Sequence, residues 1–148
     1  MLRSFLQRLP TARPIGILEG KDIYSFPVGA ELPVSELTSA DSLGPLIDKF
    51  NKEVNKYDLA GIDREIVKIR DALAHGRISA CDPRDNLRLL KLSRHRDNES
   101  QVRVEFNEAM TESWFVDQKR RVTDAIQLVS EAMKVICGVK VEQKNEVI

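Results

Sequence analysis

Two residues in the middle of the chain have the types and the spacing needed for acid–base chemistry on a phosphate. Arg70 and His75 are separated by four residues in the stretch Arg-Asp-Ala-Leu-Ala-His-Gly-Arg. An arginine stays charged and can hold a phosphate through paired hydrogen bonds. A histidine, with an ordinary pKa of about 6.5, can move a proton near neutral pH. The chain holds only two histidines and two cysteines, so catalytic chemistry is expected here.

Helical geometry decides which of the neighbouring side chains can meet. Asp71 and His75 are four residues apart, so on a helix the Asp71 carboxylate can accept a hydrogen bond from the imidazole. Arg70 precedes His75 by five residues, about 140° around an ideal helix. These two converge only where the helix ends and the histidine swings out, or where a second copy packs across a two-fold axis. The spacing favours a helix-end site that dimerisation completes.

Two amphipathic helices are expected, one before the motif and one that contains it. The first can be capped by Asp41 or Ser42 and ends before Gly61. The second is capped by Asp63 and stops at Gly76. Apolar residues recur every three or four positions in both. They are Leu43, Leu46, Ile47, Phe50, Val54 and Tyr57 in the first helix, and Ile62, Ile66, Ile69 and Leu73 in the second.

A change to alternation with a period of two predicts a β-hairpin over residues 86–107. Val102, Val104 and Phe106 alternate with Arg103 and Glu105, which is typical of a half-buried strand with the three apolar side chains on one face. The preceding arm is rich in leucine and basic residues, and a long polar tip separates the two arms. The hairpin is therefore expected as an insertion before the last helix.

The last element is expected to be a long helix. Ser113 can cap it, and it runs to about Cys137 with Gly138 at its end. Its apolar residues follow a heptad-like pattern that predicts one buried face. They are Val122, Ala125, Ile126, Val129, Ala132, Met133 and Ile136.

These elements predict one mainly α-helical domain with an extension at each end. The domain covers residues 35–138 and includes the hairpin. In the N-terminal extension, residues 1–34, segments 15–18 and 23–26 are expected to pair as a small hairpin that packs on the helices. Residues 139–148 are expected to form a frayed tail.

Composition narrows the classes of partner. Lys and Arg together number 23, as do Asp and Glu, so the chain has no net positive charge that would indicate a polyanionic partner. Aromatic residues make up only 5% of the chain, which argues against stacking platforms for single-stranded nucleic acid. The two cysteines lack the spacing of a zinc site. With no continuous apolar run of a secretory signal or membrane span, we expect a soluble cytoplasmic protein with no membrane association.

The octapeptide resembles the motif of the HEPN superfamily, Arg-x(4–6)-His, in which a polar residue often follows the arginine. Asp71 occupies that polar position. The small residues Ala72 and Ala74 and the stop at Gly76 add to the resemblance, which covers roughly residues 40–137. It implies a HEPN-like helical bundle into which the hairpin is inserted.

The resemblance also implies RNA cleavage without a metal ion or another cofactor. By position, His75 would be the acid–base group, Arg70 the phosphate clamp and Asp71 the residue that orients the histidine. The implied enzyme is a homodimer of toxin or defence type, with an antitoxin or a nucleotidyltransferase as partner. Some toxins of the superfamily carry a modified tyrosine two positions after the histidine. Arg77 stands there in this chain, which argues against regulation of that kind.

Basic residues after the motif and along the hairpin could bind the RNA backbone, with an affinity that falls as salt rises. This set comprises Arg77, Arg84, Arg88, Lys91, Arg94, Arg96 and Arg103. Acidic neighbours leave a second interpretation open, a solvated hairpin with alternating charges. Asp85, Asp97 and Glu99 are the acidic residues in question.

Non-catalytic interpretations of the motif also remain open. Arg70 could pair with Glu65 or Asp63 on the helix surface, and His75 could stabilise the helix C-terminus when protonated. The alternative function is then a catalytically inactive HEPN-like module that binds a protein partner or a nucleotide.

Overall fold

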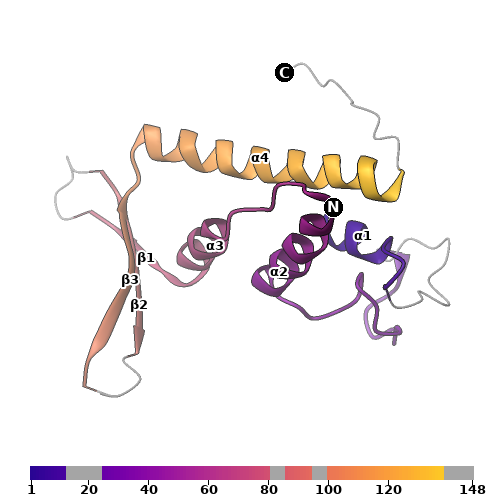
Figure 1. Ribbon diagram of the computed structural model, residues 1–148. Coiled ribbons are helices and arrows are strands. Elements are labelled where there is room, and N and C mark those ends of the chain that lie inside the picture. The colour runs from indigo at the N-terminus through magenta and orange to yellow at the C-terminus, as the bar shows by residue number, and fades with distance from the viewer. Residues whose placement is uncertain (13–24, 81–85, 95–99, 139–148) are drawn as a thin grey trace. The chain divides into compact units, whose positions relative to one another are not determined.

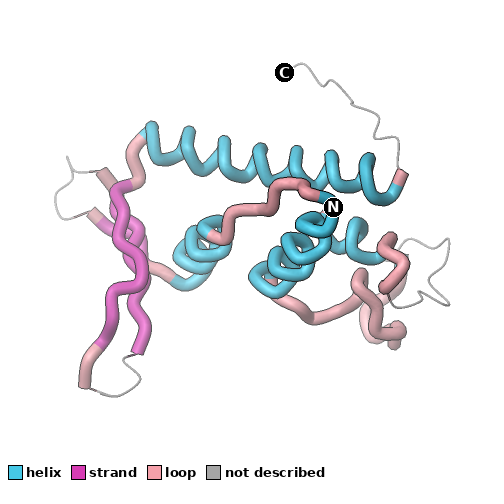
Figure 2. Tube along the Cα trace, in the orientation of Figure 1, coloured by secondary structure: helices cyan, strands magenta, loops and turns pink. Residues whose placement is uncertain are grey.

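The chain combines helices with a small antiparallel sheet (Figures 1 and 2). The computed structural model describes residues 1–12, 25–80, 86–94 and 100–138. About half of these residues are helical, and a long helix ends the described chain. The fold is therefore mixed rather than mainly helical, which differs from the expectation. The chain divides into two compact units, Met1–Ile62 with the part of the last helix from Ile126, and Asp63–Ala125.

The first unit contains α1 (Leu2–Gln7), α2 (Leu43–Val54) and the short 3₁₀ helix η3 (Asn55–Tyr57). The periodicity predicted α2 well, because its apolar residues from Leu46 to Val54 are buried. Ser42 is its N-cap residue, although its side chain makes no capping hydrogen bond. The Phe5 and Phe50 rings pack edge to face with centroids 5.1 Å apart. The buried apolar residues of this unit are Phe5, Leu6, Leu9, Leu46, Ile47, Phe50, Val54, Ile62, Val129, Ala132 and Met133.

Hydrogen bonds hold the segment before α2 against α1. The Arg3 guanidinium donates to the Asp41 carbonyl oxygen at 2.7 Å and to Ser39 Oγ at 2.8 Å. Lys49 Nζ then pairs with the carboxylates of Glu36 and Asp41 at 3.0 and 2.8 Å. Short α1 is too small to be stable by itself, so these contacts and the Phe5 packing fix it in place.

The second unit contains α3 (Glu65–His75), three strands and the first half of α4 (Glu112–Cys137). The strands are β1 (Arg77–Ser79), β2 (Arg88–Arg94) and β3 (Val102–Ala109), and the antiparallel sheet has the order β1-β2-β3. The hairpin expected over residues 86–107 is confirmed as β2 and β3. Strand β1 was not expected, because three exposed residues carry no alternation.

A β-bulge changes which side chains share a face of the hairpin. Lys91 lies opposite Phe106, but Leu92 lies opposite Val104, so Glu105 is an extra residue in β3. Phe106 is buried, whereas Val102 and Val104 are 63% and 56% exposed. The expectation of one apolar face was therefore wrong, since the bulge moves Phe106 away from the face of the two valines.

A small core joins α3, the sheet and the start of α4. It consists of Ile69, Ala72, Leu89, Phe106 and Trp114, with Met110 packed against it. The Trp114 indole donates a hydrogen bond to Glu108 Oε2 at 2.6 Å, which satisfies its polar edge. Thr111 Oγ1, rather than the Ser113 side chain, accepts a hydrogen bond from an amide of the first turn of α4, that of Trp114, at 3.1 Å.

Both ends of α3 lie where the sequence indicates, but Gly76 acts by a different mechanism. Asp63 Oδ1 accepts the Glu65 amide at 2.9 Å, as a helix cap does. Gly76 has an extended conformation with φ −83°, not the left-handed one. A Cβ atom there would collide with the carbonyl oxygens of Ala72 and Leu90. Glycine is thus required because the chain leaves α3 between the last turn of that helix and β2, with no room for a side chain.

Two further expectations fall outside the described residues. These are the small hairpin of 15–18 with 23–26, apart from its last two residues, and the tail at 139–148. Within the described part of the chain, no helix is long and apolar enough to cross a membrane. In α4, Val129, Ala132 and Met133 are buried as expected, whereas Val122 and Ile126 are about half exposed, at 50% and 49%.

Candidate functional site

The motif residues occupy the last two turns of α3. The Arg70 guanidinium and the Asp71 carboxylate form an ion pair at 3.0 Å. Both side chains are accessible, with 57% and 38% of their surface exposed. The two non-catalytic partners considered for Arg70 are engaged elsewhere, because Glu65 pairs with Lys68 and Asp63 with Arg121.

His75 is the final residue of α3 and is exposed. Among the described residues it makes no hydrogen bond or ion pair, so the expected contact with Asp71 is not formed. Asp71 instead holds the adjacent Arg70. A histidine whose two ring nitrogens are both unbonded can accept a proton from a ligand or donate one to it.

Arg70 lines an apolar groove between α3 and α4, which we call the helical groove. Its volume is about 410 Å³. Leu73 and Val122 in its walls are 51% and 50% exposed. Gln118 Oε1 and Arg121 Nε, also from lining residues, are buried without a hydrogen-bond partner among the described residues. The lining residues are Ile66, Ile69, Arg70, Leu73, Ala74, Gln118, Arg121 and Val122.

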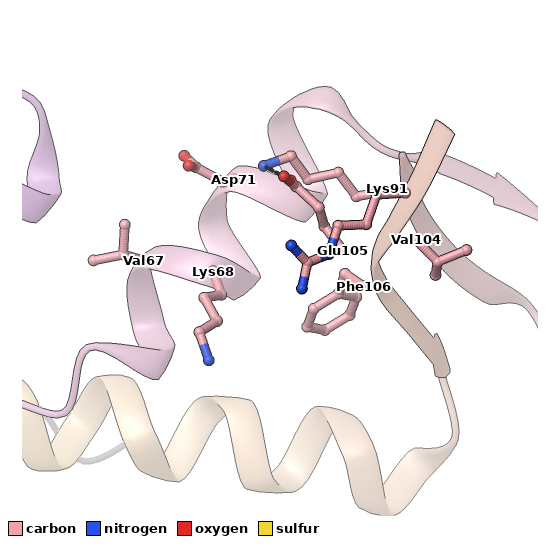
Figure 3. A pocket seen from close by; sticks show the side chains of 8 residues that line it. Val67, Lys68, Asp71, Lys91, Val104, Glu105 and Phe106 are labelled. Carbon is pink, nitrogen blue, oxygen red and sulfur yellow. Dashed lines mark ion pairs between the residues drawn. The ribbon is translucent and has the colours of Figure 1, made fainter. Parts of the chain in front are cut away.

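Asp71 lines a second cavity, between α3 and the hairpin, which we call the hairpin pocket. Its volume is about 380 Å³. Figure 3 shows Lys91 and Glu105 meeting between the strands and α3, with the Phe106 ring directed from β3 toward α3. Three cationic and two anionic side chains share this cavity with three apolar ones. The lining residues are Val67, Lys68, Asp71, Lys91, Arg103, Val104, Glu105 and Phe106.

Charges in the hairpin pocket act on one another. Lys91 Nζ lies 2.9 Å from Glu105 Oε2. This bond, followed by a hydrogen bond from Ser93 and the charge of Arg103, lowers the pKa of Glu105 from its ordinary value, against a smaller opposing effect of burial. The carboxylate therefore stays ionised at neutral pH and holds the Lys91 ammonium in place.

The described basic residues among those expected to bind RNA do not all share one patch. Lys91 and Arg103 line the hairpin pocket, but Arg88 lies three residues before Lys91, on the opposite face of β2, and bonds to Asn107 at 3.0 Å. Arg77 and Arg94 are exposed outside the pocket, while Arg84 and Arg96 fall outside the described residues.

One cation of the pocket, Lys68, was missed from the sequence. It carried a usable signal, because it is three residues before Asp71 and thus shares its helix face. Arg103 was expected among the basic residues of the hairpin, but its place beside α3 depends on the register and the bulge of the hairpin, which the sequence does not display.

Other site chemistry is sparse in the described residues. No group of three or more His, Cys, Asp or Glu side chains there could hold a metal ion. Cys137 is a free thiol whose pKa is raised by burial, which makes it a poor nucleophile.

The comparisons with known proteins add no relative. No family model, no curated protein and no solved structure matches this chain.

Proposed function

We propose that this chain is a metal-independent endoribonuclease in which Arg70 and His75 act together across a homodimer interface, within a HEPN-like arrangement of α3 and α4. The observation that supports the proposal is that the Arg70 and His75 side chains are both accessible. His75 ends α3 exposed and without a protein partner, and Arg70 lines an apolar groove on an accessible surface. Both side chains are thus available to a ligand and to a second subunit.

The helical groove supports dimerisation. Leu73 and Val122 expose apolar surface, and covering such surface is favourable by roughly 25 cal/mol per Å². The buried polar atoms of Gln118 and Arg121 also lack partners in the described chain, a state that folded proteins rarely leave uncompensated. A two-fold axis at this groove would bring Arg70 toward His75 of the partner subunit.

The proposed reaction is an internal transfer at a phosphodiester. The neutral imidazole of His75 accepts the proton of the ribose 2′-hydroxyl, and the 2′-oxygen forms a bond to phosphorus. The bond from phosphorus to the 5′-oxygen breaks, and the leaving oxygen takes its proton from the imidazolium. Arg70 donates hydrogen bonds to the phosphate oxygens as their charge grows. The Asp71 carboxylate, 3.0 Å from Arg70, holds the guanidinium in place.

Cleavage of single-stranded RNA in the presence of EDTA tests this proposal. The wild-type chain should leave 2′,3′-cyclic phosphate ends, and His75→Ala should reduce the rate by about 10²- to 10⁴-fold because proton transfer is lost. His95→Ala, at the other histidine of the chain, is the matched control and should cut normally. Unchanged melting temperatures would exclude misfolding. A His75→Ala variant that cuts like the wild type would refute the assignment.

The second candidate is a non-catalytic interaction module that uses the helical groove for a protein partner. It is favoured by the pairing of Asp71 with Arg70, which leaves the histidine without the orienting group that acid–base catalysis usually employs. A dimer that neither cuts RNA nor loses stability in His75→Ala would favour this module over the enzyme.

A further inference from the structure

The hairpin pocket has the composition of an anion site. Its three cationic side chains come from α3, β2 and β3, namely Lys68, Lys91 and Arg103. Two of them already have partners, since Lys68 pairs with Glu65 at 2.8 Å and Lys91 with Glu105 at 2.9 Å. Asp71, the other carboxylate in the pocket, is neutralised by Arg70. Arg103 makes no ion pair or hydrogen bond within the described residues.

The setting of Arg103 favours a phosphate over a small inorganic ion. Its charge already acts on Glu105, so it lies close to the Lys91–Glu105 pair. Buried Phe106 and partly buried Val67 provide apolar walls beside these charges. The Arg103 guanidinium, which bonds to none of the described residues, can bind a phosphate through two hydrogen bonds. At about 380 Å³ the cavity has room for a phosphate together with its ribose.

We propose that the hairpin pocket binds a phosphodiester group of the RNA chain, away from the bond that is cut, through Arg103 with Lys91 and Lys68. This inference rests on the proposed function, because it takes RNA as the ligand. The pocket carries no base-reading arrangement, so it supplies affinity that depends on salt rather than on sequence.

Binding of a fluorescent single-stranded RNA to the His75→Ala protein tests the pocket without cleavage. Arg103→Gln should weaken binding about ten- to hundredfold, the effect of losing hydrogen bonds to a charged group. It should also reduce the slope of log affinity against log salt by about 0.7. Arg120→Gln, at an exposed arginine of α4 that pairs with Asp117 and Asp124, is the matched control and should bind normally.

A second variant and a second ligand test whether the contact is one to phosphate. Glu105→Gln should tighten binding a few-fold, because it removes a carboxylate that competes for Lys91. Single-stranded DNA of the same sequence should lose as much affinity on Arg103→Gln as RNA does, since a phosphate contact ignores the 2′-hydroxyl. The pocket proposal would be refuted if Arg103→Gln weakened the binding of RNA but not of DNA. It would also be refuted if Arg103→Gln and Arg120→Gln bound RNA with equal affinity.

These outcomes are distinct from those of the nuclease test. If the wild type cuts RNA while Arg103→Gln binds normally, the pocket is refuted and the enzyme stands. If Arg103→Gln weakens binding but no variant cuts, the enzyme is refuted and the phosphate pocket stands.

Discussion

At the scale of single residues, Glu105 links the pocket to the pH dependence of stability. Its pKa is lowered below the ordinary 4.5 by the bonds from Lys91 and Ser93. A lowered pKa in the folded state adds stability at pH values above the unfolded pKa, and that contribution is lost as the pH falls through the folded value. Glu105→Gln should therefore melt below the wild type at neutral pH, and the difference should vanish once the pH has fallen well below 4.5.

Melting temperatures at low salt, from neutral to acidic pH, measure this effect. Ser93→Ala is the matched control, because it removes only the secondary bond to Glu105 and should show a smaller difference of the same sign. A gap between Glu105→Gln and the wild type that widens on acidification would contradict the role given to the ion pair.

The site residues show which contacts can be predicted from spacing in the sequence. Spacing along a helix predicts which side chains can meet, and it predicted that Asp71 would bond to His75. The Asp71 carboxylate bonds instead to the adjacent Arg70. The Arg70 and His75 roles stay predictions. The place of Lys68 and Arg103 in one pocket follows only once α3 and the hairpin are folded together.

At the scale of elements, Gly76 tests the contact between α3 and β2. Gly→Ala at an ordinary backbone conformation usually stabilises a protein by about 0.4–1 kcal/mol, because it restricts the unfolded chain. Here a Cβ atom would meet the carbonyl oxygens of Ala72 and Leu90, which belong to the backbone and cannot swing aside. Gly76→Ala should instead destabilise the protein by about 1–3 kcal/mol, the cost of overpacking.

Urea unfolding measures the change in stability caused by Gly76→Ala, and the sign of that change tests the predicted collision. A variant that is more stable than the wild type would mean that the carbonyl oxygens of Ala72 and Leu90 leave more room at Gly76 than the structure gives. A loss of stability with an unchanged urea dependence would confirm the close approach, because the unfolded state is then the same in both proteins.

Elements were predictable from the sequence where a periodic pattern was long. The apolar repeats of α2, α3 and α4 indicated these helices, and buried Phe50, Ile69 and Val129 agree with them. Strand β1 is too short to carry a pattern. The bulge at Glu105 is set by pairing between strands, which a single strand's sequence does not display. Most of the secondary structure, but little of the sheet's geometry, thus follows from the sequence alone.

At the scale of the whole molecule, the chain contains two compact units joined through the continuous helix α4. A length of 148 residues was expected to form one domain. The described motif residues and both cavities lie in the second unit, within Asp63–Ala125. The proposed enzyme therefore depends on how two copies of this unit meet, rather than on the fold of one copy.

Mixing two inactive variants tests that dependence directly. In a site shared between subunits, Arg70→Ala and His75→Ala chains together form one intact site, from Arg70 of one chain and His75 of the other. Equal mixing gives half mixed dimers, each with one of two sites restored, so about a quarter of the wild-type cleavage rate should return. If each chain supplied both residues of its own site, mixing would restore none.

The helical groove provides the control for this complementation. Leu73→Glu introduced into both inactive variants places a charge on the apolar groove, and should convert the dimer to a monomer in light scattering and abolish the restored cleavage. Val135→Glu, at a similarly exposed apolar residue of α4 that lines neither the groove nor the hairpin pocket, should leave the dimer and the restored rate unchanged. Restored cleavage that survives Leu73→Glu would place the interface elsewhere, because Arg70 and His75 would then meet without the groove.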